Sequence, residues 1–245
     1  MNIPQQNHIL VGLGGTGGKV LKAFKKRLFQ EFTPEERAKL PIGFLYVDTT
    51  DEMMHSGDGD KSWYVHGENA QFNANEFLFI KGISLDEIFA APSSYPGLKG
   101  VVGDPDVMKD SIGKLGVAAG QMRRAGRILF GANVSPYRAA MENVYKRVND
   151  ISKASGTCIY IFGGLAGGTG SGSIVDVVAQ TRMISAFKKG YETTSEGKAV
   201  GTNIVAYSMI PEITPPAGSD EGRYHANGYA ALKELNALLC GAWKP

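Results

Sequence analysis

Short apolar runs alternate with stretches of helical periodicity in the first part of the chain. Residues 8–14 form an apolar run that predicts a buried strand, and residues 42–50 form another. Between them, residues 16–30 predict a helix whose apolar face carries Val20, Leu21, Phe24 and Leu28. A strand, a glycine turn, a helix and a second strand make a βαβ unit, which requires parallel strands.

The same alternation continues to the end of the sequence. Further strands are predicted at residues 77–82, 157–164 and 202–210. Helices are predicted at residues 121–130, 136–151, 173–187 and 224–239, the last with Leu232, Leu235, Leu238 and Leu239 at core spacing. Residues 90–106, rich in Pro and Gly, predict a long surface excursion. The fold class is therefore α/β, with a doubly wound parallel sheet and helices on both faces.

Composition limits the classes of protein to consider. The 245 residues are 43% hydrophobic and 20% charged, as in a globular chain, and the net charge of +2 gives no nucleic-acid footprint. No apolar run is long enough to span a membrane, and the N-terminus lacks a signal-peptide layout. Cys158 and Cys240 match no metal spacing and fit a reducing compartment. We expect a cytoplasmic protein.

Two glycine clusters each follow a predicted strand and precede a predicted helix. The first lies at residues 12–17, and the second has six glycines within residues 163–172. Parallel sheets bind ligands at the C-terminal strand ends, where N–H groups and the helix dipole attract anions. Glycine lets a phosphate approach the backbone, so two clusters at one edge predict a phosphate cradle. The alternative is two tight strand–helix turns.

The first cluster alone does not identify the phosphate ligand. Its residues 12–17 match G-x-G-x-x-G, which favours a dinucleotide, but Asp48 lies well beyond the spacing of about 20 residues expected for the ribose acid. A Walker A loop fails at both ends, because Leu13 replaces the leading glycine and Val20 the Ser/Thr. An NAD-binding oxidoreductase therefore remains one alternative.

The second cluster carries a family resemblance. Its residues 166–172, AGGTGSG, resemble the signature loop of the tubulin and FtsZ superfamily at every position. Residues 46–54, 118–127 and 215–235 resemble other nucleotide loops of the superfamily in the same order. The patterns GQxRxxGR and NxYAALKEL are most similar to the prokaryotic tubulin-like family. The resemblance implies a Rossmann-like nucleotide-binding domain.

The resemblance also implies which residues contact the ligand. Phosphates would lie against Gly14, Gly15, Thr16, Ala119, Gly120, Gly167, Gly168, Thr169, Gly170, Ser171 and Gly172. The ribose and base would lie near Lys19, Gln121, Arg124, Arg127 and Asn227. Asp48 would lie near Mg²⁺, directly or through water. Three of these residues have plainer interpretations: Arg127 as a solvated charge, Asp48 as a turn cap and Lys19 as a surface lysine.

The implied function is GTP or GDP binding with Mg²⁺, in a GTPase domain whose nucleotide controls head-to-tail self-association. We expect residues 1–245 to form one nucleotide-binding domain. The superfamily's central helix, the loop with the hydrolytic acid and the C-terminal domain are not found in this sequence, so no catalytic residue is assigned. A second hypothesis is a non-polymerising module that senses GTP or GDP and binds a protein partner.

Overall fold

A mixed, mostly parallel sheet organises the computed structural model, which describes residues 6–54, 61–80, 84–98, 104, 106, 120–187, 190–195, 199–218 and 220–242. The sheet has six strands in the order β5-β2-β1-β6-β8-β7. These strands are β1 (Asn7–Leu13), β2 (Ile42–Asp48), β5 (Phe77–Phe79), β6 (Gly156–Gly164), β7 (Tyr191–Thr193) and β8 (Ala199–Met209). All pair in parallel except β7, which is antiparallel to β8.

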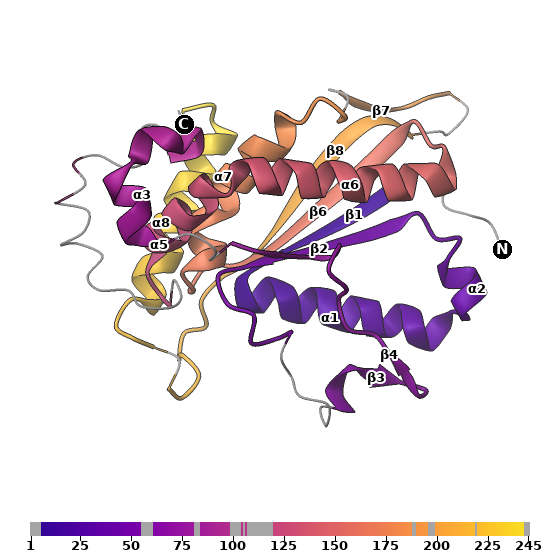
Figure 1. Cartoon of the computed structure of the whole chain (residues 1–245), viewed down its shortest axis with the longest axis horizontal. Coiled ribbons are helices and arrows are strands. Elements are labelled where there is room, and N and C mark those ends of the chain that lie inside the picture. Colours follow the sequence, from indigo (N-terminus) through magenta and orange to yellow (C-terminus); the bar gives the residue numbers. More distant parts are fainter. Residues whose placement is uncertain are drawn as a thin grey trace.

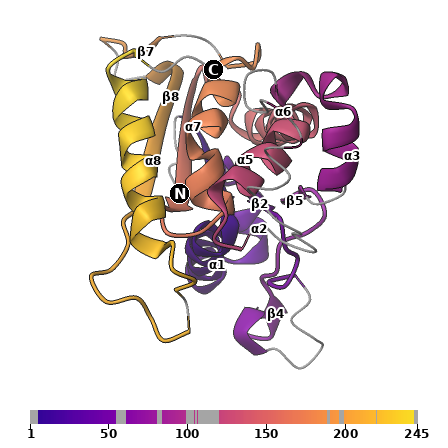
Figure 2. The ribbon, with the colours of Figure 1, turned by 90° about the vertical axis from the view of Figure 1, so that its left-hand side faces the viewer.

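Helices cover both faces of the sheet (Figures 1 and 2). The longer helices are α1 (Gly14–Glu31), α5 (Arg123–Ala132), α6 (Val134–Ser152), α7 (Thr169–Arg182) and α8 (Tyr224–Leu239). Shorter elements are α2 (Pro34–Arg37), α3 (Leu85–Ala90), the hairpin β3 (Tyr64–Val65) and β4 (Glu68–Asn69), and 3-10 turns at Lys61–Trp63, Pro92–Ser94 and Pro96–Leu98. The doubly wound α/β fold predicted from the sequence is confirmed, with one antiparallel edge strand that the sequence did not predict.

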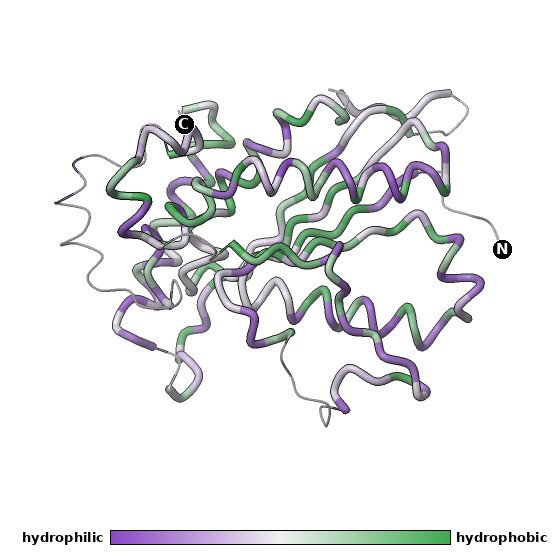
Figure 3. Tube along the Cα trace, viewed as in Figure 1, coloured by the Kyte–Doolittle hydropathy of each residue, from purple (hydrophilic) through white to green (hydrophobic). Residues whose placement is uncertain are grey.

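Alternate strand residues supply two separate apolar layers. On β1, Leu10 packs with Leu21 of α1, whereas the next residue, Val11, belongs to the layer under α6 and α7. This alternation is the two-residue period of a strand buried on both faces. Figure 3 shows the result: hydrophobic positions concentrate in the central strands, and hydrophilic positions lie along the outer sides of α1 and α6.

The buried face of α1 differs from the prediction. Leu21 is buried, but Phe24 is 42% exposed and Lys25 is buried in its place. The cause is Gly17, where an added Cβ would lie 2.5 Å from the carbonyl oxygen of Phe162, so this side of the helix sits directly on the sheet. Gly17, Leu21 and Lys25 then follow one another at i, i+4. Lys25 Nζ pairs with Glu76 Oε2 at 2.5 Å, which compensates its burial.

Helix α8 has the predicted bounds but a different core face. Leu232 and Leu239 are exposed, whereas Asn227, Gly228 and Ala231 are buried. The helix contacts α7 through this small-residue face, and a Cβ at Gly228 would lie 2.4 Å from Pro211 Cγ. Close approach at Gly228 therefore decides which leucines face inward, and only Leu235 and Leu238 pack against the core.

The region predicted as a surface excursion is partly packed. Within its described residues, Leu98 is 2% exposed and contacts Ile128 and Leu129 of α5 in a small apolar cluster. A Cβ at Gly97 would lie 2.1 Å from the carbonyl oxygen of Gly131, so the turn Pro96–Leu98 sits directly on α5. The prediction of a solvated excursion is wrong for this turn.

Candidate functional site: an anion cradle at two helix N-termini

Two long helices begin at neighbouring strand ends. Helix α1 follows β1 and α7 follows the adjacent strand β6, so both N-termini lie at the same edge of the sheet. Among the described residues, neither helix has a side-chain N-cap hydrogen bond or an acidic residue in its first turn. Uncapped first-turn N–H groups carry a partial positive charge and need acceptors. The pair is therefore suited to an anion.

The two glycine clusters touch each other at two points. Gly14 has a positive φ of 64°, and a Cβ there would lie 3.2 Å from the Gly170 nitrogen. A Cβ at Gly164 would lie 2.6 Å from Thr16 Oγ1. Glycine is required at these positions because larger side chains would force the loops apart.

Two other glycines face open space. A Cβ at Gly15 or Gly167 would meet no atom of the described residues within 4 Å. Neither position has a positive φ, so neither glycine is needed for the backbone conformation. A bare backbone at these two positions leaves room for a ligand.

A cavity of about 300 Å³ lies between the two clusters. It is lined by Leu13, Gly14, Gly15, Thr16, Asp48, Thr49, Thr50, Glu52, Gly120, Gly164, Gly167, Gly168, Thr169 and Gly170. Most of the residues predicted to bind phosphate thus share one cavity with Asp48. A larger cavity of about 480 Å³ lies beside the C-terminal end of α7, lined by residues such as Arg182 and Phe187, away from both glycine clusters.

Oxygen atoms gather on the β2 side of the cavity. Asp48 is 4% exposed; its carboxylate accepts the Tyr46 hydroxyl at 2.5 Å and the Thr49 N–H at 2.7 Å. Burial raises the pKa of Asp48, and these hydrogen bonds oppose the rise. The Thr49 and Thr169 hydroxyls are 2.9 Å apart. With Glu52 also lining the cavity, this corner offers the oxygen ligands that Mg²⁺ prefers.

Two residues predicted near the phosphates, Ser171 and Gly172, lie outside the cavity lining. Ser171 is 1% exposed; its hydroxyl accepts Arg123 Nε at 2.8 Å and donates to the Asn227 carbonyl at 3.3 Å. A Cβ at Gly172 would lie 2.2 Å from the Arg123 carbonyl oxygen, so Gly172 packs against α5. Both residues bring α5 and α8 close to α7 and do not appear in the cavity lining. Ala119 lies outside the described residues.

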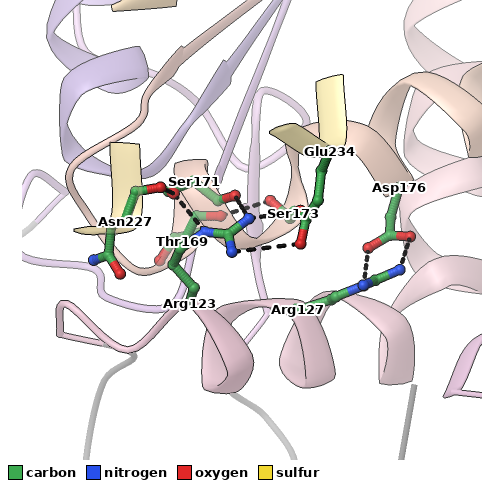
Figure 4. Close-up of polar contacts among 8 residues, drawn as sticks. All are labelled: Arg123, Arg127, Thr169, Ser171, Ser173, Asp176, Asn227 and Glu234. Atoms are coloured by element: carbon green, nitrogen blue, oxygen red, sulfur yellow. Dashed lines mark hydrogen bonds and ion pairs between the residues drawn. The ribbon is translucent and has the colours of Figure 1, made fainter. Parts of the chain in front are cut away.

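The residues predicted near the ribose and base lie on several elements, and two of them, Gln121 and Asn227, are hydrogen-bonded to each other. Lys19 and Arg124 are exposed on α1 and α5. Arg127 Nε pairs with Asp176 Oδ2 at 2.8 Å, so its guanidinium joins α5 to α7 (Figure 4). Gln121 accepts the Glu221 N–H at 3.0 Å through Oε1, and its carbonyl accepts the Asn227 amide. Contact of these residues with a nucleotide stays a prediction.

Arg123 is one of the residues that sequence reasoning missed. Its guanidinium donates to the Ser171 hydroxyl and carbonyl and pairs with Glu234 Oε2 at 2.6 Å (Figure 4). The available signal was its place in the pattern GQxRxxGR, where it stands four residues before Arg127 and so on the same side of α5. Thr49 and Glu52 were also missed, although they follow Asp48 directly after β2.

Fold and site together define an α/β protein with a glycine-lined cavity, suited to an anion, at the C-terminal edge of its parallel strands. A family model described as tubulin like matches residues 9–244. The chain therefore belongs to the tubulin-like family, and the assignment made from the loop at residues 166–172 is confirmed.

Solved structures add a likeness in fold. CetZ from Methanosaeta thermophila strain DSM 6194 matches with a TM-score of 0.52 and 14% identity, over 95% of this chain and 43% of that one. CetZ1 from Haloferax volcanii, a GDP-bound monomer, matches with a TM-score of 0.49 and 13% identity, over 93% and 47%. The chain thus spans less than half the length of these structures. Comparison with curated proteins gives no match.

Proposed function

We propose that this chain is a guanine-nucleotide-binding domain whose glycine clusters hold a diphosphate. The observation that carries the proposal is the pair of uncapped helix N-termini meeting at one cavity with open space above Gly15 and Gly167. Backbone N–H groups there would stabilise phosphate charge without any cationic side chain. The tubulin-like family supplies the preference for guanine.

Each part of the cavity takes a role in this proposal. The first turn of α7, with Gly168, Thr169 and Gly170, would hold the α- and β-phosphates, and Gly14, Gly15 and Thr16 would close on them from α1. The Gly120 carbonyl accepts the Gly168 N–H at 2.8 Å, which holds Gly120 beside the start of α7. From this position Gly120 would approach a γ-phosphate.

A divalent cation belongs at the β2 corner. Asp48 would hold Mg²⁺ directly or through water, with its carboxylate oriented by the Tyr46 hydroxyl and the Thr49 N–H. Burial and the neighbouring Asp48 raise the pKa of Tyr46, so its hydroxyl stays a donor to Asp48. Bound Mg²⁺ would neutralise part of the phosphate charge.

Turnover and assembly are further parts of the proposal. We place hydrolysis at a head-to-tail contact between subunits, where the neighbour supplies the group that activates water, and nucleotide would control that contact. A cytoplasmic setting fits the two unpaired cysteines, Cys158 and Cys240. Among the described helices, none is long and apolar enough to cross a bilayer.

The decisive experiment is to denature the purified protein and identify the nucleotide that it releases by chromatography. We expect GDP or GTP at close to one per chain. If the protein is purified empty, equilibrium titration with GDP and with ADP decides the same question. Release of NAD, or a preference for ADP, would overturn the guanine assignment, and loss of all nucleotide binding would overturn the cradle itself.

A further inference from the structure

Asn227 occupies an unusual position for a polar side chain. It lies in the first turn of α8, is 7% exposed, and donates both amide hydrogens to backbone carbonyls. The acceptors are the carbonyls of Gln121 and Ala166, each 2.8 Å from Nδ2. Both hydrogens of the amide are therefore donated. Their two acceptors belong to different loops, which are more than 40 residues apart in sequence.

Both acceptors adjoin the cavity. Gln121 follows Gly120 and Ala166 precedes Gly167, and those two glycines line the same cavity. A direct bond between the two loops is the Gly168 N–H to the Gly120 carbonyl, at 2.8 Å. The Asn227 amide supplies a second connection, which comes from helix α8 and bridges the two loops.

The connection extends into helix α7. The backbone carbonyl of Asn227 accepts the Ser171 hydroxyl, and that hydroxyl in turn accepts Arg123 Nε (Figure 4). Arg123 also pairs with Glu234, which lies about two turns after Asn227 along α8. One end of α8 is thus bonded to the loop before α5, the loop after β6 and the first turn of α7.

We propose that Asn227 is a positioning residue for the anion cradle: by bonding both loops, it sets the spacing of the N–H groups that meet the phosphates. The inference rests on the proposed function and deepens it. The two amide hydrogens of Asn227 are donated to Gln121 and Ala166, so the proposed role uses its donors within the protein. It would act through the loops, so its loss would alter phosphate binding more than it alters the rest of the fold.

The test compares Asn227→Asp with Asn236→Asp. The first substitution keeps the shape but sets a carboxylate against two carbonyls. The second makes the same change at an exposed position of the same helix. Removing two donors should weaken GDP binding by about tenfold or more, whereas Asn236→Asp should bind GDP as the unaltered protein does. In ligand-free protein, amide hydrogen exchange at residues 167–170 should accelerate only in Asn227→Asp.

Acidification provides a readout that a general loss of stability would not give. Once protonated, the introduced carboxyl regains one donor, so GDP affinity in Asn227→Asp should partly recover between about pH 8 and pH 5.5, relative to Asn236→Asp. If Asn227→Asp does not fold, Asn227→Ala removes the donors without adding charge and should show the same exchange and affinity changes at constant pH.

The outcomes separate the two proposals. Unchanged affinity and unchanged exchange in a folded Asn227 variant would overturn the positioning role and leave the cradle intact. If the unaltered protein binds no GDP but the exchange effect is present, the proposed function fails while the positioning of the loops stands. Accelerated exchange over the whole chain, without selectivity for residues 167–170, would also overturn the inference.

Discussion

Glycines of the two clusters do different work at the residue scale. Gly14, Gly164 and Gly170 let the clusters touch, because a Cβ at each would come within 3.2 Å of an atom of the opposite cluster or the adjoining strand. Gly15 and Gly167 have open space above them. The sequence does not distinguish the glycines at loop contacts from the glycines that face the cavity. It shows where a backbone without a side chain is needed, but not whether protein or ligand lies against it.

Gly15→Val and Gly167→Val should fold normally and lose nucleotide. Their side chains would enter the 300 Å³ cavity without meeting protein atoms of the described residues, so they should displace only a ligand. We expect GDP affinity to fall by about 100-fold, or ~2.7 kcal/mol, in isothermal titration. Ala23→Val, on the exposed side of α1, is the matched control. Wild-type affinity in both glycine variants would place the nucleotide elsewhere.

At the scale of elements, the start of α7 decides which side chains face the cavity. Apolar periodicity predicted the helix from residue 173, but it begins at Thr169, inside the glycine cluster. Its first turn therefore aims Thr169 at the cavity and turns Ser171 toward α5 and α8. Periodicity could not locate this start, because glycines carry no apolar signal. The pairing of Arg127 with Asp176 likewise depends on how α5 packs on α7, which no local pattern contains.

The Arg127–Asp176 pair should hold α5 to α7 without affecting the ligand. Burial raises the pKa of Asp176, and Arg127 counteracts that rise. Arg127→Met should therefore raise this pKa further and lower the free energy of unfolding at about pH 7.5 by roughly 1–3 kcal/mol, because a half-buried carboxylate loses its partner.

The raised pKa of Asp176 also determines how the stability loss in Arg127→Met changes with pH. With the folded-state pKa above the unfolded one, the penalty on the ionised form is complete above the folded-state pKa and is lost as pH falls from the folded-state pKa to the unfolded-state pKa. Denaturant titrations of Arg127→Met should thus converge on wild type in acid, with Arg147→Met, exposed on α6, as control. Weakened GTP binding without loss of stability would instead support the sequence-based placement of Arg127 at the ribose.

For the whole molecule, the sequence predicted the architecture and the edge of the sheet at which the two glycine clusters meet. Alternating apolar runs and helices determine a doubly wound sheet, and the handedness of parallel crossovers leaves few topologies. The antiparallel strand β7 was missed because three exposed residues give no apolar pattern. The start of β7 lies close against β8 at Gly201, which has a φ of 78° and where a Cβ would lie 1.6 Å from the Gly190 carbonyl oxygen.

Self-association belongs to this scale and has a direct test. If nucleotide controls a head-to-tail contact, light scattering should rise on addition of GTP with Mg²⁺, increase steeply with protein concentration, and stay low with GDP. Gly167→Val, unable to bind nucleotide, should stay low in both. Flat scattering in the presence of bound GTP would contradict assembly of this chain and support the sensing module instead.

The attachment of α8 to both loops has a thermodynamic consequence. Tyr229, Leu232 and Leu239 are exposed on this helix, while its buried side bonds the loops around the cavity through Asn227. A molecule that binds the exposed side of α8 and moves this helix would also move the two loops that Asn227 bonds. Linkage is reciprocal, so such a molecule and the nucleotide would change each other's affinity by the same factor. Helix α8 would then couple binding at its exposed side to binding of the phosphates in the cavity.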